Sequence, residues 1–279
     1  MRTVYLGTSD FAAVVLTRLA QSDHRPSLVV TRPDARKGRG QALRSPPVAD
    51  AARALGIEID QPESVNADEA RARIAAAQPD ALVVCAFGAL IKEPLLSDYE
   101  MVNVHPSLLP RWRGAAPVER AIMAGDEETG VSIMRLTAGW DSGPVCLAAG
   151  EPIARDDTYG TLAPRLQELG ARLLVEALDE RPPYVEQDET QVTYAEKIGP
   201  EDRTLDLERP AIENERVVRA LTPHIGARIE LPGGTFLGVR AAKATPDGHL
   251  ELLEVQPAGG RAMAYADYAR GHAPVPGVI

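Results

Sequence analysis

One short stretch carries two side chains suited to acyl-transfer chemistry. Asn103 and His105 stand two residues apart at the end of the strand candidate 101–105. Because side chains alternate between the two faces of a strand, both point to the same side. An amide donor beside an imidazole suits the stabilisation of an oxyanion, and the imidazole also moves protons. Since Pro106 and Pro110 restrict the following loop, we interpret this strand end as a candidate catalytic centre.

A second polar loop, residues 137–144, follows the strand candidate 129–136, and Asp141 is its only acid. A carboxylate near an imidazole can orient the ring and take up a proton through a water. An aspartate just before a glycine is equally typical of an Asx-turn, and Gly143 follows closely. The spacing alone leaves both interpretations open.

Covalent and metal catalysis are disfavoured. The two cysteines, Cys85 and Cys146, lie far apart in apolar runs, which is typical of small buried hydrophobic residues. The five histidines are scattered, and no Cys/His spacing typical of a metal site occurs.

A basic stretch is the second functional signal. The chain carries a net charge of −10, which by itself argues against a general nucleic-acid binder. Residues 32–44 nevertheless hold one acid and five basic residues, namely Arg32, Arg36, Lys37, Arg39 and Arg44. Two glycines and a proline predict a flexible loop there, which would attract a polyanion. A merely solvated run of charges is the alternative.

The elements that position these residues follow a βαβα series. Strand candidates are 2–6, 27–31, 57–60, 79–85, 101–105, 129–136 and 144–149, and helix candidates are 10–21, 46–55, 67–77, 115–124 and 159–178. This series predicts an α/β fold with a mostly parallel sheet and helices on both faces. Ligands bind outside the carboxyl ends of such strands.

Two helix starts need a capping residue. Gly7–Phe11 follows the first strand and lacks the Gly-x-Gly-x-x-Gly fingerprint, which disfavours a nicotinamide dehydrogenase. Its Asp10 reads as a helix N-cap or as a ligand contact, and both stay open. Asp156 or Asp157 is the expected cap of the helix at 159–178.

The length of 279 residues predicts about two domains. We expect a catalytic domain at 1–181, a linker at 182–204 and a small β-rich domain at 205–279. The last contains a short helix within 205–222 and strands at 227–231, 235–243 and 249–255. Because no apolar run is long enough to span a membrane and no leader is visible, we expect a cytoplasmic protein.

Several motifs resemble the 10-formyltetrahydrofolate-dependent formyltransferases. Asn-x-His-x-Ser-Leu-Leu-Pro at 103–110 and Asp-Ser-Gly-Pro at 141–144 match the signature of that superfamily. Further stretches resemble its methionyl-tRNA formyltransferase branch: Gly-Thr-Ser-Asp-Phe-Ala at 7–12, Arg-Pro-Asp at 32–34 with Gly-Arg-Gly at 38–40, Arg-Trp-Arg-Gly at 111–114, and Gln-Asp-Glu at 187–189 with Thr-Tyr-Ala-Glu-Lys at 193–197. The resemblance runs from residue 2 to about 222.

The resemblance implies a Rossmann-like catalytic domain followed by an OB-like barrel, here shortened. It implies transfer of the formyl group of 10-formyltetrahydrofolate to the α-amine of initiator methionyl-tRNA for translation initiation. The implied catalytic residues are Asn103, His105 and Asp141. The implied folate contacts are Phe87, Gly88, Ala89, Leu90, Ile91, Ser107, Leu108, Leu109, Pro110, Ala138, Gly139 and Trp140, and the implied tRNA contacts are Arg36, Lys37, Arg39 and Arg44. We expect no metal, no membrane partner and a monomer.

Two departures from the branch bear on the tRNA. Gln41 and Ala42 stand where lysines usually follow Gly-Arg-Gly, and only three clear strands occur after Thr204. Alternatives with the same catalytic residues therefore stay open: an amino-sugar nucleotide as acceptor, or hydrolysis of 10-formyltetrahydrofolate. A non-catalytic RNA-binding module is disfavoured by the catalytic residues themselves.

Overall fold

The chain divides into two compact units in this computed structural model, which describes residues 1–37 and 41–279. The first unit comprises Met1–Arg113, Gly130–Glu151 and Pro164–Thr193. The second comprises Gly114–Thr129, Pro152–Ala163 and Tyr194–Ile279. Among the described residues, no helix is long and apolar enough to cross a membrane.

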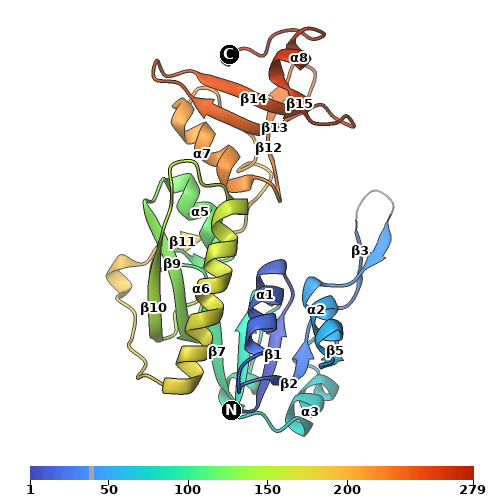
Figure 1. Cartoon of the computed structure of the whole chain (residues 1–279), viewed down its shortest axis with the longest axis vertical. Coiled ribbons are helices and arrows are strands. Elements are labelled where there is room, and N and C mark those ends of the chain that lie inside the picture. The colour runs from blue at the N-terminus through green and yellow to red at the C-terminus, as the bar shows by residue number, and fades with distance from the viewer. Residues whose placement is uncertain (38–40) are drawn as a thin grey trace. The chain divides into compact units, whose positions relative to one another are not determined.

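A seven-stranded sheet forms the centre of the first unit (Figure 1). Its order is β10-β9-β7-β6-β1-β2-β5. The strands are β1 (Thr3–Gly7), β2 (Pro26–Val30), β5 (Glu58–Asp60), β6 (Ala81–Cys85), β7 (Glu100–His105), β9 (Glu128–Arg135) and β10 (Val145–Pro152). The five strands from β5 to β7 pair in parallel, whereas β9 runs antiparallel to β7. The predicted α/β class with a mostly parallel sheet is confirmed.

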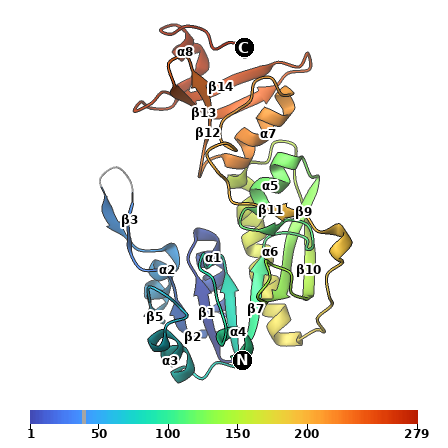
Figure 2. The same cartoon turned by 180° about the vertical axis from the view of Figure 1, so that it is seen from behind.

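Side chains alternate between the two faces of each strand. Because β1 and β6 are buried at every position, both faces of the sheet are covered. Val4 and Leu6 pack in one cluster with Ile74 and Leu95. The hydroxyl of Tyr5, which points to the other face, donates to the Ala12 carbonyl at 2.6 Å. Figures 1 and 2 show the strands and helices of the first unit from opposite sides. The helices are α1 (Asp10–Leu19), α2 (Pro47–Leu55), α3 (Asp68–Ala76), α4 (Leu95–Asp98) and α6 (Tyr159–Glu180).

Hydroxyl side chains cap two of the helices, so the aspartates predicted as caps are wrong there. Ser9, not Asp10, is the N-cap of α1, because its side chain accepts from the Ala12 N–H. At the start of α6, Thr158 accepts from the Thr161 N–H, and Thr161 accepts from the Thr158 N–H. In α1 the cap precedes Asp10, which is already the first helical residue, whereas in α6 it follows Asp157. In both helices the hydroxyl, and not the carboxylate, occupies the N-cap position.

The basic stretch forms an antiparallel hairpin rather than the predicted flexible loop. Strands β3 (Ala35–Lys37) and β4 (Ala42–Arg44) pair from Ala35 opposite Arg44 to Lys37 opposite Ala42. The Arg36 guanidinium donates to the Gln41 carbonyl at 3.2 Å. Backbone pairing of two short strands thus orders the described part of a stretch whose composition is typical of a loop.

The second unit combines helix α7 with an antiparallel sheet in the order β12-β13-β14-β15. Its core includes Val218 and Leu221 of α7 together with Leu237 and Val239 of β13. The elements are α5 (Pro117–Ala124), α7 (Ala211–Leu221), β12 (Ala227–Leu231), β13 (Thr235–Ala244), β14 (Leu250–Gln256), β15 (Met263–Ala264) and α8 (Tyr265–Ala269). Two short strands, β8 (Arg113–Gly114) and β11 (Tyr194–Ala195), pair with each other, and the 3-10 turn η1 spans Glu189–Gln191. The domain limits 1–181, 182–204 and 205–279 stay a prediction.

An ion pair within the second unit makes its stability depend on pH. Arg120 donates to both carboxylate oxygens of Asp202, at 2.6 and 2.9 Å. Burial of Asp202 opposes its ionisation, but the Arg120 guanidinium and the Gly199 N–H more than offset this and lower its pKa. A lowered carboxyl pKa stabilises the folded state above the ordinary pKa of about 4, and the contribution disappears as pH falls through the folded value.

We expect Asp202→Asn to lower the free energy of unfolding by about 2 kcal/mol at pH 7, because charge-assisted hydrogen bonds to a partly buried group are lost. The difference in free energy of unfolding between Asp202→Asn and the wild type narrows below about pH 4. Denaturant unfolding from pH 3 to 7 measures it. Asp267→Asn is the control, because Asp267 pairs with Arg270 at an exposed position and its loss costs below about 0.5 kcal/mol. If the difference in free energy of unfolding stays constant down to pH 3, Asp202 does not stabilise the fold through its ion pair with Arg120.

Candidate active site

The strand order of the first unit reverses between β1 and β6. From β1 the chain proceeds outward through β2 to β5, and then returns to place β6 on the other side of β1. Loops at such a reversal separate and leave a crevice at the carboxyl ends of the strands. The loops after β1 and β6 meet here, because the Thr8 hydroxyl donates to the Phe87 carbonyl at 2.7 Å. The predicted location at the carboxyl edge of the sheet therefore has a structural basis in this topology.

His105 ends β7, next to β6, and is held at both ring nitrogens. Its Nε2 lies 2.9 Å from the Trp112 carbonyl oxygen, so Nε2 carries the proton of that hydrogen bond. Its Nδ1 lies 3.6 Å from Oδ2 of Asp141, within ion-pair reach but beyond a normal hydrogen bond. The side chain is 5% exposed, so this ring has little freedom to turn. Asn103, two residues earlier on β7, is also buried.

The loop with Asp141 reaches His105 by a route that strand order alone does not predict. Because β9 is antiparallel to β7, its last residue Arg135 lies opposite Val102, near the start of β7. Residues 136–143 then return toward the carboxyl end of β7, where the Asp141 carboxylate meets the imidazole. A side chain at Gly143 is excluded, because a Cβ there would lie 1.9 Å from the Arg135 carbonyl oxygen. The predicted juxtaposition of His105 and Asp141 is present, although β9 is not a parallel strand.

Both neighbours of His105 adopt left-handed backbone conformations. The φ angle is +44° at Asp141 and +64° at Trp112. Aspartate tolerates this region, whereas a bulky tryptophan rarely adopts it. Such conformations persist only where surrounding contacts enforce them, and they cluster at functional sites. The two groups that face the imidazole are therefore placed at a cost in backbone energy.

The predicted folate contacts lie on three loops of the first unit. Residues 87–91 follow β6, and their backbone is fixed by Arg32, which donates to the Gly88 carbonyl, and by Asn66, which donates to the Leu90 carbonyl. Residues 107–110 follow β7, where Ser107 is fully buried and bonds to the Arg111 carbonyl. Residues 138–140 precede Asp141, and the side chains of Leu90 and Trp140 are 63% and 70% exposed. Two large apolar side chains thus face solvent on loops flanking the site.

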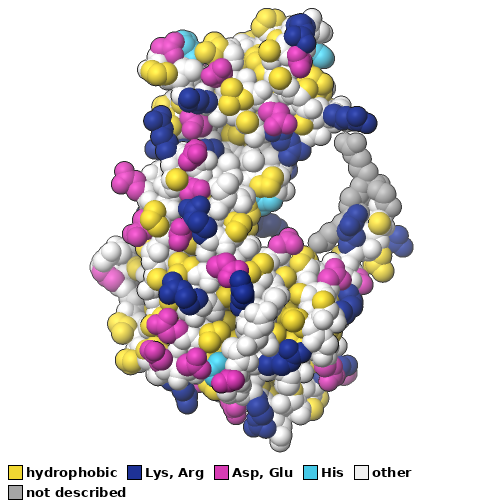
Figure 3. All heavy atoms as spheres, viewed as in Figure 1, with side chains coloured by type: hydrophobic (Ala, Val, Ile, Leu, Met, Phe, Trp, Pro, Cys, Tyr) yellow, Lys and Arg dark blue, Asp and Glu magenta, His cyan; other side chains and the backbone are white. Residues whose placement is uncertain are grey.

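The predicted tRNA contacts divide between described and undescribed residues. Arg36 and Arg44 are exposed on the two strands of the hairpin β3–β4. Lys37 belongs to β3, and Arg39 lies outside the described residues. Figure 3 shows dark-blue basic side chains on this hairpin beside the grey atoms. Acidic and basic side chains are mixed over the rest of that view.

Covalent chemistry through cysteine finds no support among the described residues. Burial raises the pKa of Cys85 to about 12, so it stays a protonated thiol at neutral pH. Cys146 is half-buried rather than fully buried, and burial raises its pKa as well. Within residues 1–37 and 41–279, no three His, Cys, Asp or Glu side chains are grouped to hold a metal ion.

Sequence reasoning missed the residues that support the site. Arg113, Gln187 and Thr193 all bond to the backbone or side chains around His105 and Asp141. Gln187 and Thr193 fall in the stretch predicted as a linker, because its polar composition resembles a connection. The available signal was the resemblance, because Arg113, Gln187 and Thr193 all lie in stretches that resemble the methionyl-tRNA formyltransferase branch.

Comparison with known proteins shows the family of the chain. Residues 1–178 match the protein family described as formyl transferase. A methionyl-tRNA formyltransferase of Halorhodospira halophila is 42% identical over 305 residues, covering 99% of this chain and 98% of the relative. One of Dechloromonas aromatica is 40% identical over 298 residues, covering 98% of this chain and 96% of the relative.

Solved structures share the fold. The methionyl-tRNA formyltransferase from Clostridium thermocellum superposes with a TM-score of 0.67 at 15% identity, covering 95% of this chain and 99% of that one. HypX from Aquifex aeolicus, solved in complex with tetrahydrofolic acid, gives a TM-score of 0.67 at 17% identity and covers 96% of this chain and 46% of that one. Taken with the full-length identity to the relatives above, these matches show that the chain belongs to the formyl transferase family, in its methionyl-tRNA formyltransferase branch.

Proposed function

We propose that this chain transfers a formyl group from 10-formyltetrahydrofolate to the α-amine of initiator methionyl-tRNA. The observation that carries the proposal is the buried His105 ring, set between the Asp141 carboxylate and the Trp112 carbonyl in a chain of this family. Bound 10-formyltetrahydrofolate supplies the formyl carbon that the amine attacks. Every other step described below belongs to side chains of the first unit.

Each of the three side chains has a distinct part. The Asn103 amide and the His105 imidazole stabilise the negative charge that develops on the formyl oxygen. The Asp141 carboxylate orients the imidazole and balances its charge when it carries two protons. The imidazole takes up the proton that leaves the attacking amine and passes it to N10 of the folate as the bond between N10 and the formyl carbon breaks. Because the ring is buried, these interactions act in a medium of low polarity and are stronger than in water.

The loops around the site fit a folate. A pterin is a flat ring system with polar edges, so it needs apolar surface and backbone hydrogen-bonding groups. The exposed Leu90 and Trp140 offer the first, and the backbone of 87–91, anchored by Arg32 and Asn66, offers the second. The residues proposed to hold the folate are Phe87, Gly88, Ala89, Leu90, Ile91, Ser107, Leu108, Leu109, Pro110, Ala138, Gly139 and Trp140.

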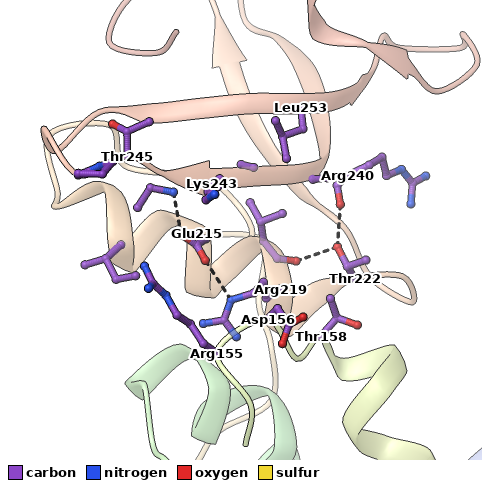
Figure 4. A pocket seen from close by; sticks show the side chains of 16 residues that line it. Arg155, Asp156, Thr158, Glu215, Arg219, Thr222, Arg240, Lys243, Thr245 and Leu253 are labelled. Atoms are coloured by element: carbon purple, nitrogen blue, oxygen red, sulfur yellow. Dashed lines mark hydrogen bonds and ion pairs between the residues drawn. The ribbon is translucent and has the colours of Figure 1, made fainter.

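We infer that basic side chains of the second unit also meet the RNA partner. Figure 4 shows a cavity of about 1000 Å³ lined by residues of 155–158, α7 and β13. Glu215 accepts from the Ala244 N–H at 2.7 Å and lies 3.5 Å from Nε of Arg219, so Arg219 is held by protein groups. Arg155 and Lys243 are exposed at its rim. The acidic Asp156 is exposed in the same lining, and we propose that Arg155 and Lys243 meet phosphates there.

An acceptor assay tests the proposal. Purified chain is mixed with 10-formyltetrahydrofolate and with charged initiator tRNA, charged elongator methionyl-tRNA, an amino-sugar nucleotide or no acceptor. We expect formyl-methionyl-tRNA from the initiator tRNA. Formylated amino sugar, or release of formate without an acceptor, would instead support one of the two alternative reactions. Absence of formyl-methionyl-tRNA from folded protein overturns the proposal.

The hairpin supplies a separate prediction about the tRNA. We expect the double variant Arg36→Ala/Arg44→Ala to raise the KM for methionyl-tRNA several-fold and leave kcat nearly unchanged. Each lost phosphate contact also reduces the slope of log(kcat/KM) against log salt by about 1, so the slope falls by about 2. Steady-state kinetics from low to high salt measure both effects. Arg172→Ala is the control, because this exposed arginine lies on α6. An unchanged salt slope in the double variant excludes Arg36 and Arg44 as tRNA contacts.

A further inference from the structure

We propose that Gln187 is a positioning residue that holds the Asp141 loop against His105. Its side-chain Nε2 donates to the Asp141 carbonyl at 2.8 Å and to the Gly143 carbonyl at 2.7 Å. Its Oε1 accepts from Nε of Arg113 at 3.0 Å. The Gln187 amide therefore links both ends of the turn 141–143, which carries the Asp141 carboxylate, to Arg113. Arg113 follows the catalytic strand β7 in the chain. This inference rests on the proposed function and assigns a task to a residue outside the three catalytic side chains.

The orientation of the Gln187 amide follows from its neighbours. An arginine only donates and a carbonyl only accepts, so Oε1 faces Arg113 and the NH₂ group faces the two carbonyls. Arg113 is itself fixed, because its side chain is 3% exposed and it donates to both carboxylate oxygens of Glu189 at 2.7 and 3.2 Å. The hydrogen bonds from Arg113 lower the pKa of Glu189, which stays ionised at neutral pH. We call the Gln187 amide with its two hydrogen bonds to the Asp141 and Gly143 carbonyls the clamp. The clamp is thus anchored on the ion pair between Arg113 and Glu189.

The same segment also supports the other side of the imidazole. Trp112, whose carbonyl bonds to Nε2 of His105, donates its N–H to the Thr193 hydroxyl at 2.9 Å. The Arg113 N–H donates to the Thr193 carbonyl at 2.9 Å. Gln187 and Thr193 therefore hold both groups that face the ring, and both of these groups have positive φ angles that need external contacts to persist.

Loss of the clamp is expected to act on catalysis through the placement of Asp141. Without the two hydrogen bonds, the turn 141–143 loses two contacts that hold the left-handed backbone of Asp141 in place. A misplacement of about 1 Å at a catalytic group costs up to about 100-fold in rate. We expect Gln187→Met, which keeps the length of the side chain and removes its polar atoms, to lower kcat by about 10- to 100-fold. The KM for tRNA stays close to the wild-type value, because the Gln187 amide is engaged by protein groups.

A double-mutant cycle with Asp141→Asn separates positioning from general loss of structure. That substitution keeps the Asp141 carbonyl, so the clamp can still form. If Gln187 acts through the carboxylate, Gln187→Met lowers kcat in the wild-type background and has little further effect in the Asp141→Asn background. Equal fold losses in both backgrounds overturn the proposal, because they indicate an effect independent of Asp141. The readout is single-turnover formylation of methionyl-tRNA at saturating substrates.

Two further variants keep the test interpretable. Gln187→Glu keeps the pair with Arg113 but cannot donate to the two carbonyls, so it should lose activity like Gln187→Met. Full activity of Gln187→Glu overturns the donor role of Gln187. This variant serves as the test if Gln187→Met does not fold. Gln191→Met makes the same chemical change four residues away, where the amide bonds to Asp188, and should keep wild-type kcat. Inactive wild-type protein would count against the proposed function, whereas active wild type with an active Gln187→Met counts against this inference alone.

Discussion

Replacing His105 by alanine is expected to lower the kcat of formyl transfer by about 1000-fold, within the range that general acid-base catalysis supplies. The ring lies 3.6 Å from Oδ2 of Asp141 through Nδ1 and bonds to the Trp112 carbonyl through Nε2. Its removal therefore takes away a proton carrier and a stabiliser of the formyl oxygen in one step. The KM for methionyl-tRNA changes little, because the lost interactions strengthen only in the transition state. Single-turnover formylation at saturating substrates measures the effect.

The control is a histidine outside the site. His249 is 58% exposed and pairs with Asp247. His249→Ala therefore removes an imidazole without changing Asn103, His105 or Asp141. It should retain wild-type kcat. Because His105 is buried, His105→Ala leaves a small cavity that costs about 2 kcal/mol or more of stability, so thermal unfolding is recorded alongside. A folded His105→Ala protein that retains more than a tenth of the wild-type kcat removes the imidazole from the mechanism.

The sheet and the catalytic strand were predictable because their signals are local. Runs such as Ala81–Cys85 are apolar throughout, which is typical of strands buried on both faces. Asn103 and His105 share a face because any strand alternates its side chains. The order of strands was not predictable in the same way, since pairing joins segments that are distant in the chain. The antiparallel direction of β9 became visible only from its register with β7.

Residues that position other residues are the hardest to predict. Gln187 and Thr193 stand in a polar stretch whose composition is that of a connection, and their roles arise from contacts with residues 46 and 81 positions away. The caps Ser9 and Thr158 show the same limit on a smaller scale. Several hydroxyls and carboxylates near a helix start can accept a hydrogen bond, and the backbone geometry selects among them.

Asn103 carries the second large prediction, in which two substitutions of different shape are compared. The Asn103 side chain is buried on the face that also holds His105, and its NH₂ group is the donor proposed for the formyl oxygen. Asn103→Ala removes the donor and should lower kcat by about 100-fold, as the loss of one oxyanion donor does elsewhere. Asn103→Asp keeps the shape but replaces the donor with an acceptor, which repels the developing negative charge. We therefore expect the isosteric variant to be the less active of the two.

The order of these two activities decides between an electrostatic and a packing role for Asn103. If the residue only filled space on its face of the sheet, the isosteric Asn103→Asp would retain more activity than Asn103→Ala, which leaves a gap among buried neighbours. If it donates to the formyl oxygen, the order reverses, and the KM for methionyl-tRNA stays nearly constant in both variants. Folate binding, followed by equilibrium titration, checks that both proteins retain the folded site. An Asn103→Asp protein more active than Asn103→Ala would leave His105 as the only stabiliser of the formyl oxygen.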